Sequence, residues 1–234
     1  MDLRELYAYG AEDFTAYRMP ENYELAGRRF TLTMDGGDRL DLVFPRKSAE
    51  DIRAGGGSEK YGCACFKISD SVFFAVCTTE AAGVVYVLDM DRALVTRIIQ
   101  KASGESVRTF GFIGEDGTGE RHTLTSDLDG NAAEWTLGLT PASVVRLTFR
   151  DGTVFAAFPL AADGGPEVRV SDFSAVCVSE GIYLQHARIE IGERILSGCL
   201  LSSFRSLLSI GCLFGVSKDG AFYCKTLGAY GRLL

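Results

Sequence analysis

Two stretches of sequence decide the fold: Phe30-Thr31-Leu32-Thr33-Met34 with Leu40-Asp41-Leu42-Val43-Phe44, and Trp135-Thr136-Leu137-Gly138-Leu139 with Val145-Arg146-Leu147-Thr148-Phe149. Apolar side chains recur at every second position, the period of a strand with one buried face. The stretches align at a constant offset (135 − 30 = 149 − 44 = 105). This pattern predicts an internal repeat in which Phe30 is equivalent to Trp135, and Phe44 to Phe149.

The repeat continues along the chain. Residues 68–74 match residues 178–184 at an offset of 110 (178 − 68), and residues 87–94 match residues 200–207 at an offset of 113 (200 − 87). Glycine-containing turns such as Asp35-Gly36-Gly37-Asp38 favour tight hairpins between strands. No stretch of helical periodicity is long enough to connect parallel strands, so we expect antiparallel meanders. We expect one short N-terminal helix within residues 3–17.

Each copy offers seven or eight short strands, which suits a small up-and-down barrel that closes its own edges. We therefore predict an all-β protein of two tandem lipocalin-like antiparallel β-barrel units, spanning residues 1–120 and 121–234. The polar residues 114–120 read as the linker. The pattern leaves open whether the copies form two barrels or share one.

Charge and hydropathy exclude some classes of binding partner. The chain has 31 acidic and 24 basic residues, a net charge of −7, and no cluster of Lys and Arg that could follow a phosphate backbone. Nucleic acid is therefore not expected as a partner. The chain starts without the basic-then-apolar order of a signal peptide, and no apolar run approaches the roughly 18 residues of a membrane span. We expect a cytoplasmic protein with no membrane partner.

Seven cysteines, an odd number, lie in apolar strand-like runs. This predicts reduced, buried thiols rather than a disulfide framework. The spacing of Cys63-Ala64-Cys65 differs from the longer spacers of structural zinc sites, so no metal is expected. No glycine-rich phosphate loop follows a strand, and no cofactor is expected.

The order of motifs resembles the family of molybdenum cofactor biosynthesis protein F (MoaF), a bacterial group of calycin-like proteins with related N- and C-terminal domains. The resemblance rests on residues 25–33 (LAGRRFTLT), 71–76 (SVFFAV), 85–90 (VYVLDM), 122–130 (HTLTSDLDG) and 182–184 (IYL). It implies a calycin barrel with an interior cavity, the first unit matching the family's N-terminal domain and the second its C-terminal domain.

Candidate site residues come from one polar strand and from the aromatic residues. Strand alternation places His186 and Arg188 on one face of the run 182–190, where they suit an anionic or carbonyl ligand with Glu190 as a partner, or form an ordinary solvated ladder. Apolar surroundings for a ligand would come from Trp135 and Tyr183. A second candidate position, in the first barrel, is formed by Tyr61 and Cys63. The other histidine, His122, reads as a solvated loop residue.

Two functions remain open at this point. The first is the binding of a small, partly apolar metabolite in a barrel cavity, extended by acid/base chemistry of the isomerase or lyase type. The second is a non-catalytic structural or regulatory module that acts as a homodimer or as a platform for a partner. A cavity with convergent polar groups favours the first, and filled barrels favour the second. The sequence leaves enzymatic activity undecided.

Overall fold

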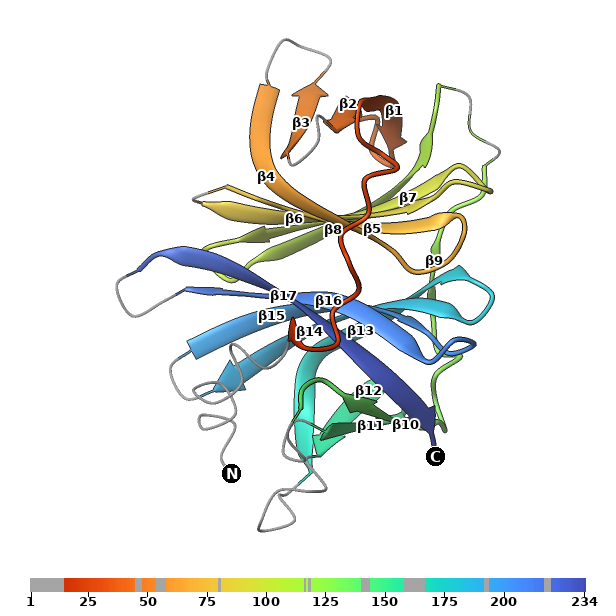
Figure 1. Ribbon diagram of the computed structural model, residues 1–234, viewed down its shortest axis with the longest axis vertical. Helices are drawn as coiled ribbons and strands as arrows, with labels where there is room; N and C mark the ends of the chain where they lie inside the picture. The colour runs from red at the N-terminus through yellow and green to blue at the C-terminus, as the bar shows by residue number, and fades with distance from the viewer. Residues whose placement is uncertain are drawn as a thin grey trace. The chain divides into compact units, whose positions relative to one another are not determined.

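The computed structural model describes residues 15–44, 48–53, 58–79, 81–115, 117, 119–139, 144–157, 167–191, 194–216 and 220–234. These residues form strands and turns with almost no helix, which confirms the all-β prediction (Figure 1). They divide into two compact units. The first unit contains Pro20–Thr123 and residues 220–223. The second contains residues 15–19, Leu124–Val216 and Cys224–Leu234.

The first unit is a closed eight-stranded barrel in which every strand pairs with its neighbour in the chain. Its last strand returns to the first, with Leu32 opposite Ile113. The pairings are antiparallel, as the hairpin turns predict. The strands are β1 (Arg28–Met34), β2 (Arg39–Phe44), β3 (Ser48–Arg53), β4 (Ser58–Lys67), β5 (Val72–Thr78), β6 (Ala82–Asp89), β7 (Leu94–Lys101) and β8 (Ser106–Ile113).

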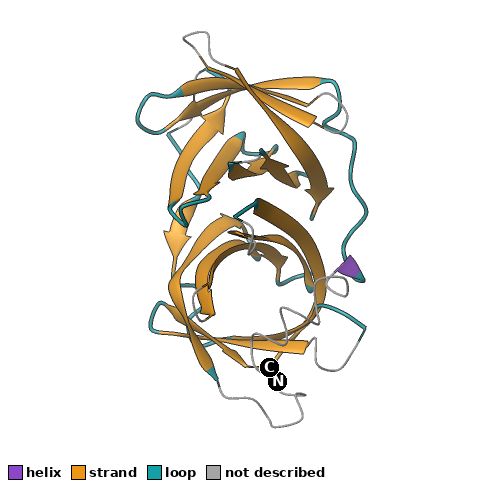
Figure 2. Ribbon diagram, turned by 90° about the vertical axis from the view of Figure 1, so that its left-hand side faces the viewer, coloured by secondary structure: helices purple, strands orange, loops and turns teal. Residues whose placement is uncertain are grey.

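The second unit repeats this order. Strands β10 to β17 pair in sequence, β17 pairs with β10, and β12 pairs with β13, so that the eight strands form a ring, seen end-on in the lower part of Figure 2. Strand β9 joins the sheet beside β13. The strands are β9 (Thr123–Thr125), β10 (Ala132–Thr136), β11 (Val144–Arg150), β12 (Thr153–Ala157), β13 (Val168–Ser179), β14 (Ile182–Ile191), β15 (Arg194–Ser203), β16 (Leu208–Val216) and β17 (Phe222–Leu233).

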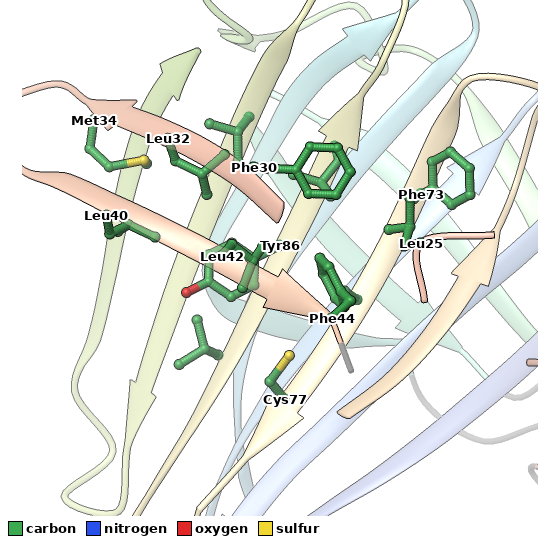
Figure 3. Close-up of a cluster of buried hydrophobic side chains, with 14 residues drawn as sticks. Leu25, Phe30, Leu32, Met34, Leu40, Leu42, Phe44, Phe73, Cys77 and Tyr86 are labelled. Carbon is green, nitrogen blue, oxygen red and sulfur yellow. The ribbon is translucent and has the colours of Figure 1, made fainter. Parts of the chain in front are cut away.

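The interior of the first unit is mostly apolar, but it also contains Arg97 of β7, which lies opposite Tyr86, stacks over its ring and is 6% exposed. Alternate residues of β1 and β2 point into this interior, as the period of two predicts, and they meet Phe73 and Tyr86 from the opposite strands (Figure 3). This cluster contains fourteen buried side chains, all of them hydrophobic. At about 25 cal/mol per Å² of apolar surface, such burial is the main stabilising contribution to the unit.

Equivalent turns at the start of each unit correct part of the repeat alignment. The Gly27 N–H donates to the Phe44 oxygen (2.5 Å), and the Gly130 N–H donates to the Phe149 oxygen (2.9 Å), both glycines having φ of 80°. The equivalence of Phe44 and Phe149 is therefore confirmed. The first strands, however, are offset by 103 (130 − 27), so the predicted equivalence of Phe30 and Trp135 is wrong. Trp135 corresponds instead to Leu32 (135 − 103).

The physical reason is a hairpin two residues longer in the second unit (149 − 130 = 19 against 44 − 27 = 17). A two-residue insertion preserves the inward and outward alternation of a strand, so the hydrophobic pattern gave no sign of it.

Strand register and turn geometry decide the two other predicted offsets, 110 and 113. Lys67 pairs with Phe73, and Cys177 pairs with Tyr183, which confirms the offset of 110. The turns after β6 and β15 contain Ala93 and Leu207, whose φ angles of 53° and 55° are left-handed. Their offset is 114 (207 − 93), so the predicted offset of 113 is wrong by one residue, which exchanges the two faces of the strand.

The N-terminal helix is not shown. Residues 3–14 of the expected range lie outside the described part of the chain, and residues 15–17 form one turn in which the Arg18 N–H donates to the Thr15 oxygen (3.1 Å; purple in Figure 2). Among the described residues no helix has the length and apolar character needed to cross a bilayer.

Candidate functional site in the interior of the second unit

The interior of the second unit is lined by aromatic and aliphatic side chains from most of the ring. Two buried clusters meet through Leu147 and Phe204, which contact both of them. Their buried members are Ala133, Trp135 and Ala229 in one cluster, and Leu128, Phe149, Val154, Val170 and Ala175 in the other.

Trp135, on β10, is the largest of these side chains and is fully buried. It lies opposite Gly231 of β17, where a Cβ atom would come within 2.5 Å of the Trp135 Cζ3 atom. In the first unit the equivalent pair is Leu32 and Ile113. The glycine therefore makes the space that the indole ring occupies.

Three aromatic rings gather at one end of this interior. Phe204, in the turn after β15, makes edge-to-face contacts with Trp135 (5.8 Å between centroids) and with Tyr183 (5.6 Å). The Phe204 N–H donates to the Gly181 oxygen (2.8 Å), which fixes this turn against the β13–β14 turn. Burial raises the pKa of Tyr183, as do Asp127, Cys177 and Glu180, so the phenol stays protonated and can donate a hydrogen bond at neutral pH.

A chain of buried polar groups crosses three strands beside these rings. The Gln185 Nε2 atom donates to the Ser202 Oγ atom (3.0 Å), and the Ser202 and Ser209 hydroxyls are 2.9 Å apart. The Ser209 hydroxyl donates to the Leu201 carbonyl (3.2 Å), so the Ser202 hydroxyl must be the donor between the two serines. All three side chains are buried.

The first unit has no such chain at the equivalent positions. The offsets of 110 and 114 place Gln185, Ser202 and Ser209 where the first unit has the following core residues: Ala75, Leu88 and Val95. At these three positions the first unit thus has apolar side chains and the second a polar chain, while the first unit has the buried Arg97 where the second has Gly211 (211 − 114 = 97). The fold itself does not require these polar groups.

The structure divides the predicted site residues of the second unit between two faces. Tyr183 packs into the interior cluster, and Trp135 reaches it through Phe204. His186 and Arg188 lie on the opposite face of β14, where the His186 Nε2 atom is 3.0 Å from the Ser197 hydroxyl and the Arg188 guanidinium is 4.0 Å from the Asp172 carboxylate. The side chain of Glu190 lies outside the described part. Ligand binding by these residues stays a prediction.

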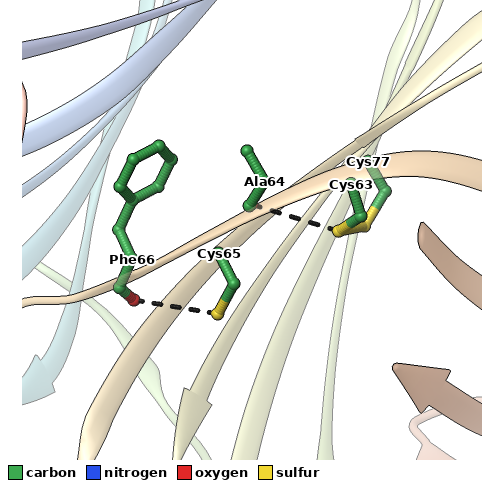
Figure 4. Close-up of a disulfide and its surroundings, with 5 residues drawn as sticks. All are labelled: Cys63, Ala64, Cys65, Phe66 and Cys77. Atoms are coloured by element: carbon green, nitrogen blue, oxygen red, sulfur yellow. Dashed lines mark hydrogen bonds between the residues drawn. A yellow bond between two sulfur atoms is a disulfide. The ribbon is translucent and has the colours of Figure 1, made fainter. Parts of the chain in front are cut away.

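The prediction of seven reduced thiols is wrong. Cys63 of β4 and Cys77 of β5 lie directly opposite each other, with 4.1 Å between Cα atoms, and form a disulfide in the first unit (Figure 4). Cross-strand pairing brings together residues fourteen apart in sequence, which local spacing does not reveal. Of the other site candidate in this unit, Tyr61, only the backbone is described.

The remaining cysteines are thiols: Cys65, Cys177, Cys199, Cys212 and Cys224. Burial raises the pKa of Cys65 to about 12, which makes it a poor nucleophile toward the neighbouring disulfide. Burial also raises the pKa of Cys212, which contacts the Cys199 and Cys224 thiols. No group of three or more His, Cys, Asp or Glu side chains in the described ranges is arranged to hold a metal ion.

His122 is the polar residue that sequence reasoning most clearly missed. It is not solvated but 1% exposed, within the first unit. Its Nδ1 atom is 2.8 Å from the Thr96 hydroxyl, and its Nε2 atom is 4.0 Å from the Asp89 carboxylate. Burial lowers the pKa of His122 to about 4, against the opposing effect of Asp89, so the ring is neutral at physiological pH.

Glu134 forms a second buried charge that the sequence pattern did not single out. It is 5% exposed and accepts hydrogen bonds from Arg146 (2.6 and 3.0 Å) and Arg232 (2.7 Å), on the strands flanking β10. Burial alone would raise the pKa of Glu134, but the two arginines outweigh it and lower that pKa. Because Glu134 alternates with the inward Trp135, this charge lies on the outer face of the ring.

The fold and this interior define a class: an eight-stranded, up-and-down β-barrel repeated within one chain, with a polar chain inside one copy. The MoaF N-terminal domain matches residues 8–103, fewer than half of the 234 residues, and confirms the MoaF-like assignment predicted from the sequence. No curated protein matches the chain. Among solved structures, a putative β-lactamase from Burkholderia vietnamiensis matches at 14% identity and a TM-score of 0.37, over 41% of this chain and 98% of that one.

Proposed function

We propose that the second unit binds a small, partly apolar molecule in its interior, in the manner of a calycin. The observation that carries this proposal is the replacement of Ala75, Leu88 and Val95 of the first unit by Gln185, Ser202 and Ser209 at equivalent positions. The same fold closes without these polar groups, so their presence calls for a reason other than folding.

Energetics support a functional reason. Burying a hydroxyl or an amide without a hydrogen bond costs about 1–3 kcal/mol of stability. When the group is hydrogen-bonded, each bond contributes a net stabilisation of about 0.5–1.5 kcal/mol. An apolar replacement of similar shape would be neutral or stabilising. A polar chain among aromatic rings is, by contrast, the usual lining of a small-molecule site, where a few polar groups set the orientation of a mostly apolar guest.

Binding is favoured over catalysis by the side chains themselves. The polar chain consists of an amide and two hydroxyls, which are neither acids nor bases at neutral pH, and Tyr183 is held protonated. These groups can orient and polarise a ligand. Isomerase or lyase chemistry at this position would use Tyr183 as its acid.

The other function considered above, a structural module, fits the first unit better. Its fourteen-residue cluster is hydrophobic throughout, and a disulfide joins two of its strands. We therefore propose that the first unit is the scaffold and the second the binding unit.

The test replaces the three polar residues of the second unit with the residues at the equivalent positions of the first unit. The triple variant Gln185→Ala, Ser202→Leu, Ser209→Val takes the residues of the sister unit and should fold, because each replacement restores a core that the same fold tolerates. Thermal shifts and native mass spectrometry across a metabolite panel should reveal a ligand for the wild type that the triple variant binds at least tenfold more weakly.

Val95→Ala in the first unit is the matched control. It should lower the melting temperature, because the substitution leaves a cavity in the core of the first unit. It should not change ligand affinity, because the proposed binding site lies in the second unit. If no panel member binds the wild type, or if the triple variant binds as tightly as the wild type, the proposal is wrong.

A further inference from the structure

We propose that the ligand is uncharged and planar, and that it carries a hydrogen-bond acceptor which receives the N–H of Trp135. This inference rests on the proposed function and names the class of molecule that the second unit takes. It follows from three observations: an unsatisfied donor, its orientation, and the charge of its surroundings.

The indole N–H of Trp135 is buried and has no hydrogen-bond partner among the described residues, although the side chain is 0% exposed. Leaving a buried donor unpaired is unfavourable, and native structures contain few such groups. The equivalent residue of the first unit is Leu32, which has no polar atom to satisfy. The tryptophan and its open donor are therefore specific to the second unit.

The orientation of the ring places this donor away from β17. The atoms of Trp135 nearest the position of a Gly231 Cβ are Cζ3, Cε3 and Cη2, on the six-membered ring. The Nε1 atom lies on the far edge of the indole from Cε3 and Cζ3. The benzene ring is thus seated on the glycine, and the N–H edge is left for another group.

Two other hydroxyl donors nearby are already used. The Ser202 and Ser209 hydroxyl protons are used within the chain that ends on the Leu201 carbonyl. The Trp135 N–H, like the Tyr183 hydroxyl, accordingly remains for a guest, and the guest must supply an acceptor such as a carbonyl oxygen or a ring nitrogen.

The charge of the surroundings selects an uncharged guest. Strand alternation from the inward Trp135, Leu147 and Ala187 places the charged neighbours Glu134, Arg146 and Arg188 on the outer face, where Glu134 is paired with two arginines. An ion placed in the interior would lose its hydration without a counter-charge. The edge-to-face contacts among Trp135, Phe204 and Tyr183 favour a flat aromatic guest, which can stack on or abut such rings.

The experiment compares three dyes on the full chain. Prodan is an uncharged naphthalene with a ketone acceptor; dimethylaminonaphthalene is the same ring system without the ketone; anilinonaphthalene sulfonate is an anion. Affinities are measured for the wild type, for Trp135→Phe, and for a chain with benzothienylalanine at position 135, which keeps the shape of the indole and replaces N–H with sulfur. Since Trp135 is the single tryptophan, this replacement is made at one site.

The expected result is saturable binding of Prodan to the wild type, weakened about fivefold by benzothienylalanine as one neutral hydrogen bond is lost. Dimethylaminonaphthalene should bind both proteins equally. Bound Prodan should emit at longer wavelength in the wild type than in the benzothienylalanine protein, because its ketone is hydrogen-bonded only in the former. Trp135→Phe, whose smaller ring leaves a gap, should weaken both dyes and weaken Prodan more.

Equal affinity of Prodan for the wild type and the benzothienylalanine protein would overturn the inference, as would tighter binding of the anionic dye. Failure of Prodan to bind, with a panel ligand that still depends on Ser202 and Ser209, would overturn the inference alone. Absence of any panel ligand would overturn the proposed function as well.

Discussion

At the scale of single residues, the informative positions are buried polar side chains that local patterns do not mark. His122 follows a polar loop and reads as solvated, yet it packs against Thr96 and Asp89. Asp89 in turn accepts hydrogen bonds from the Asp91 and Arg92 N–H groups and from the Arg92 side chain (2.7 Å). The burial of these residues depends on the closed barrel, and the residues that neighbour them in the sequence do not indicate it.

The titration of His122 predicts an acid-sensitive stability. Its pKa is about 4 in the folded chain and about 6.5 when unfolded, so the unfolded state binds more protons between these values. The unfolding free energy should therefore be unaffected by this group above pH 6.5 and should fall by about 3 kcal/mol as the pH drops from 6.5 to 4. Urea unfolding at half-unit pH steps measures this slope.

His122→Asn should remove that part of the slope. His186→Gln alters the only other histidine and should retain it, since His122 is still present. Equal slopes for the wild type and His122→Asn would show that His122 titrates normally in the folded protein.

At the scale of elements, alternation and turns predicted the strands, the antiparallel pairing and most of the repeat. One error comes from two added residues before β11, which keep the buried face and so leave alternation unchanged. The other is one residue in the alignment of β15, whose equivalent strand β6 is buried on both faces and therefore has no alternation to fix the register. The sequence pattern singled out Trp135 and Tyr183, whose role in binding stays a prediction, but it did not single out Gln185, Ser202 and Ser209, because their significance lies in what the sister unit has instead. Cross-strand contacts such as Cys63–Cys77 lie beyond any local spacing.

The disulfide between β4 and β5 predicts a definite thiol count. Denatured protein should react with five equivalents of a thiol reagent before reduction and seven after it. Reduction should also lower the unfolding free energy by about 2–3 kcal/mol, as expected for a loop of about fifteen residues. Seven reactive thiols without reductant would contradict the pairing, and Cys63→Ser with Cys77→Ser should give five under both conditions.

Close packing between β10 and β17 predicts the effect of one methyl group. Gly231→Ala places a Cβ 2.5 Å from the Trp135 ring and should destabilise the chain by about 1–3 kcal/mol while changing the emission of this single tryptophan. Gly62→Ala, on a strand of the first unit, meets its nearest atom at 3.9 Å and should stay within about 0.5 kcal/mol of the wild type. Similar stabilities of the two variants would show that the indole is not seated on Gly231.

At the scale of the whole molecule, two units with the same strand order have different interiors. The eight strands of each unit follow the same order, while their cores differ at the positions that a guest would contact. Duplication of a barrel therefore allows the two copies to carry different polar groups in their interiors: Arg97 in the first, and Gln185, Ser202 and Ser209 in the second. The matched residues of the first unit are the natural controls for every substitution in the second.

Ring closure in the second unit predicts the result of a truncation. Removal of Cys224–Leu234 takes the partner strand from β10 and β16 together and uncovers Trp135. The tryptophan emission should shift to longer wavelength, and the unpaired edges should promote association. Removal of Leu234 alone, which is 58% exposed, should leave the emission unchanged. An unshifted emission in the longer truncation would mean that β17 does not close the ring.

The pairing of β10 with β17 also sets an order of events during translation. Ala133 pairs with Leu233, one hundred residues later in the chain (233 − 133 = 100), whereas its other partner in the ring, Leu147 of the next strand, follows only fourteen residues later (147 − 133 = 14). At about 5–20 residues per second, β10 waits roughly 5–20 s for β17. During that interval the nascent second barrel presents an open edge beside Trp135, and this is the stage at which a ribosome-associated chaperone would have the most to protect.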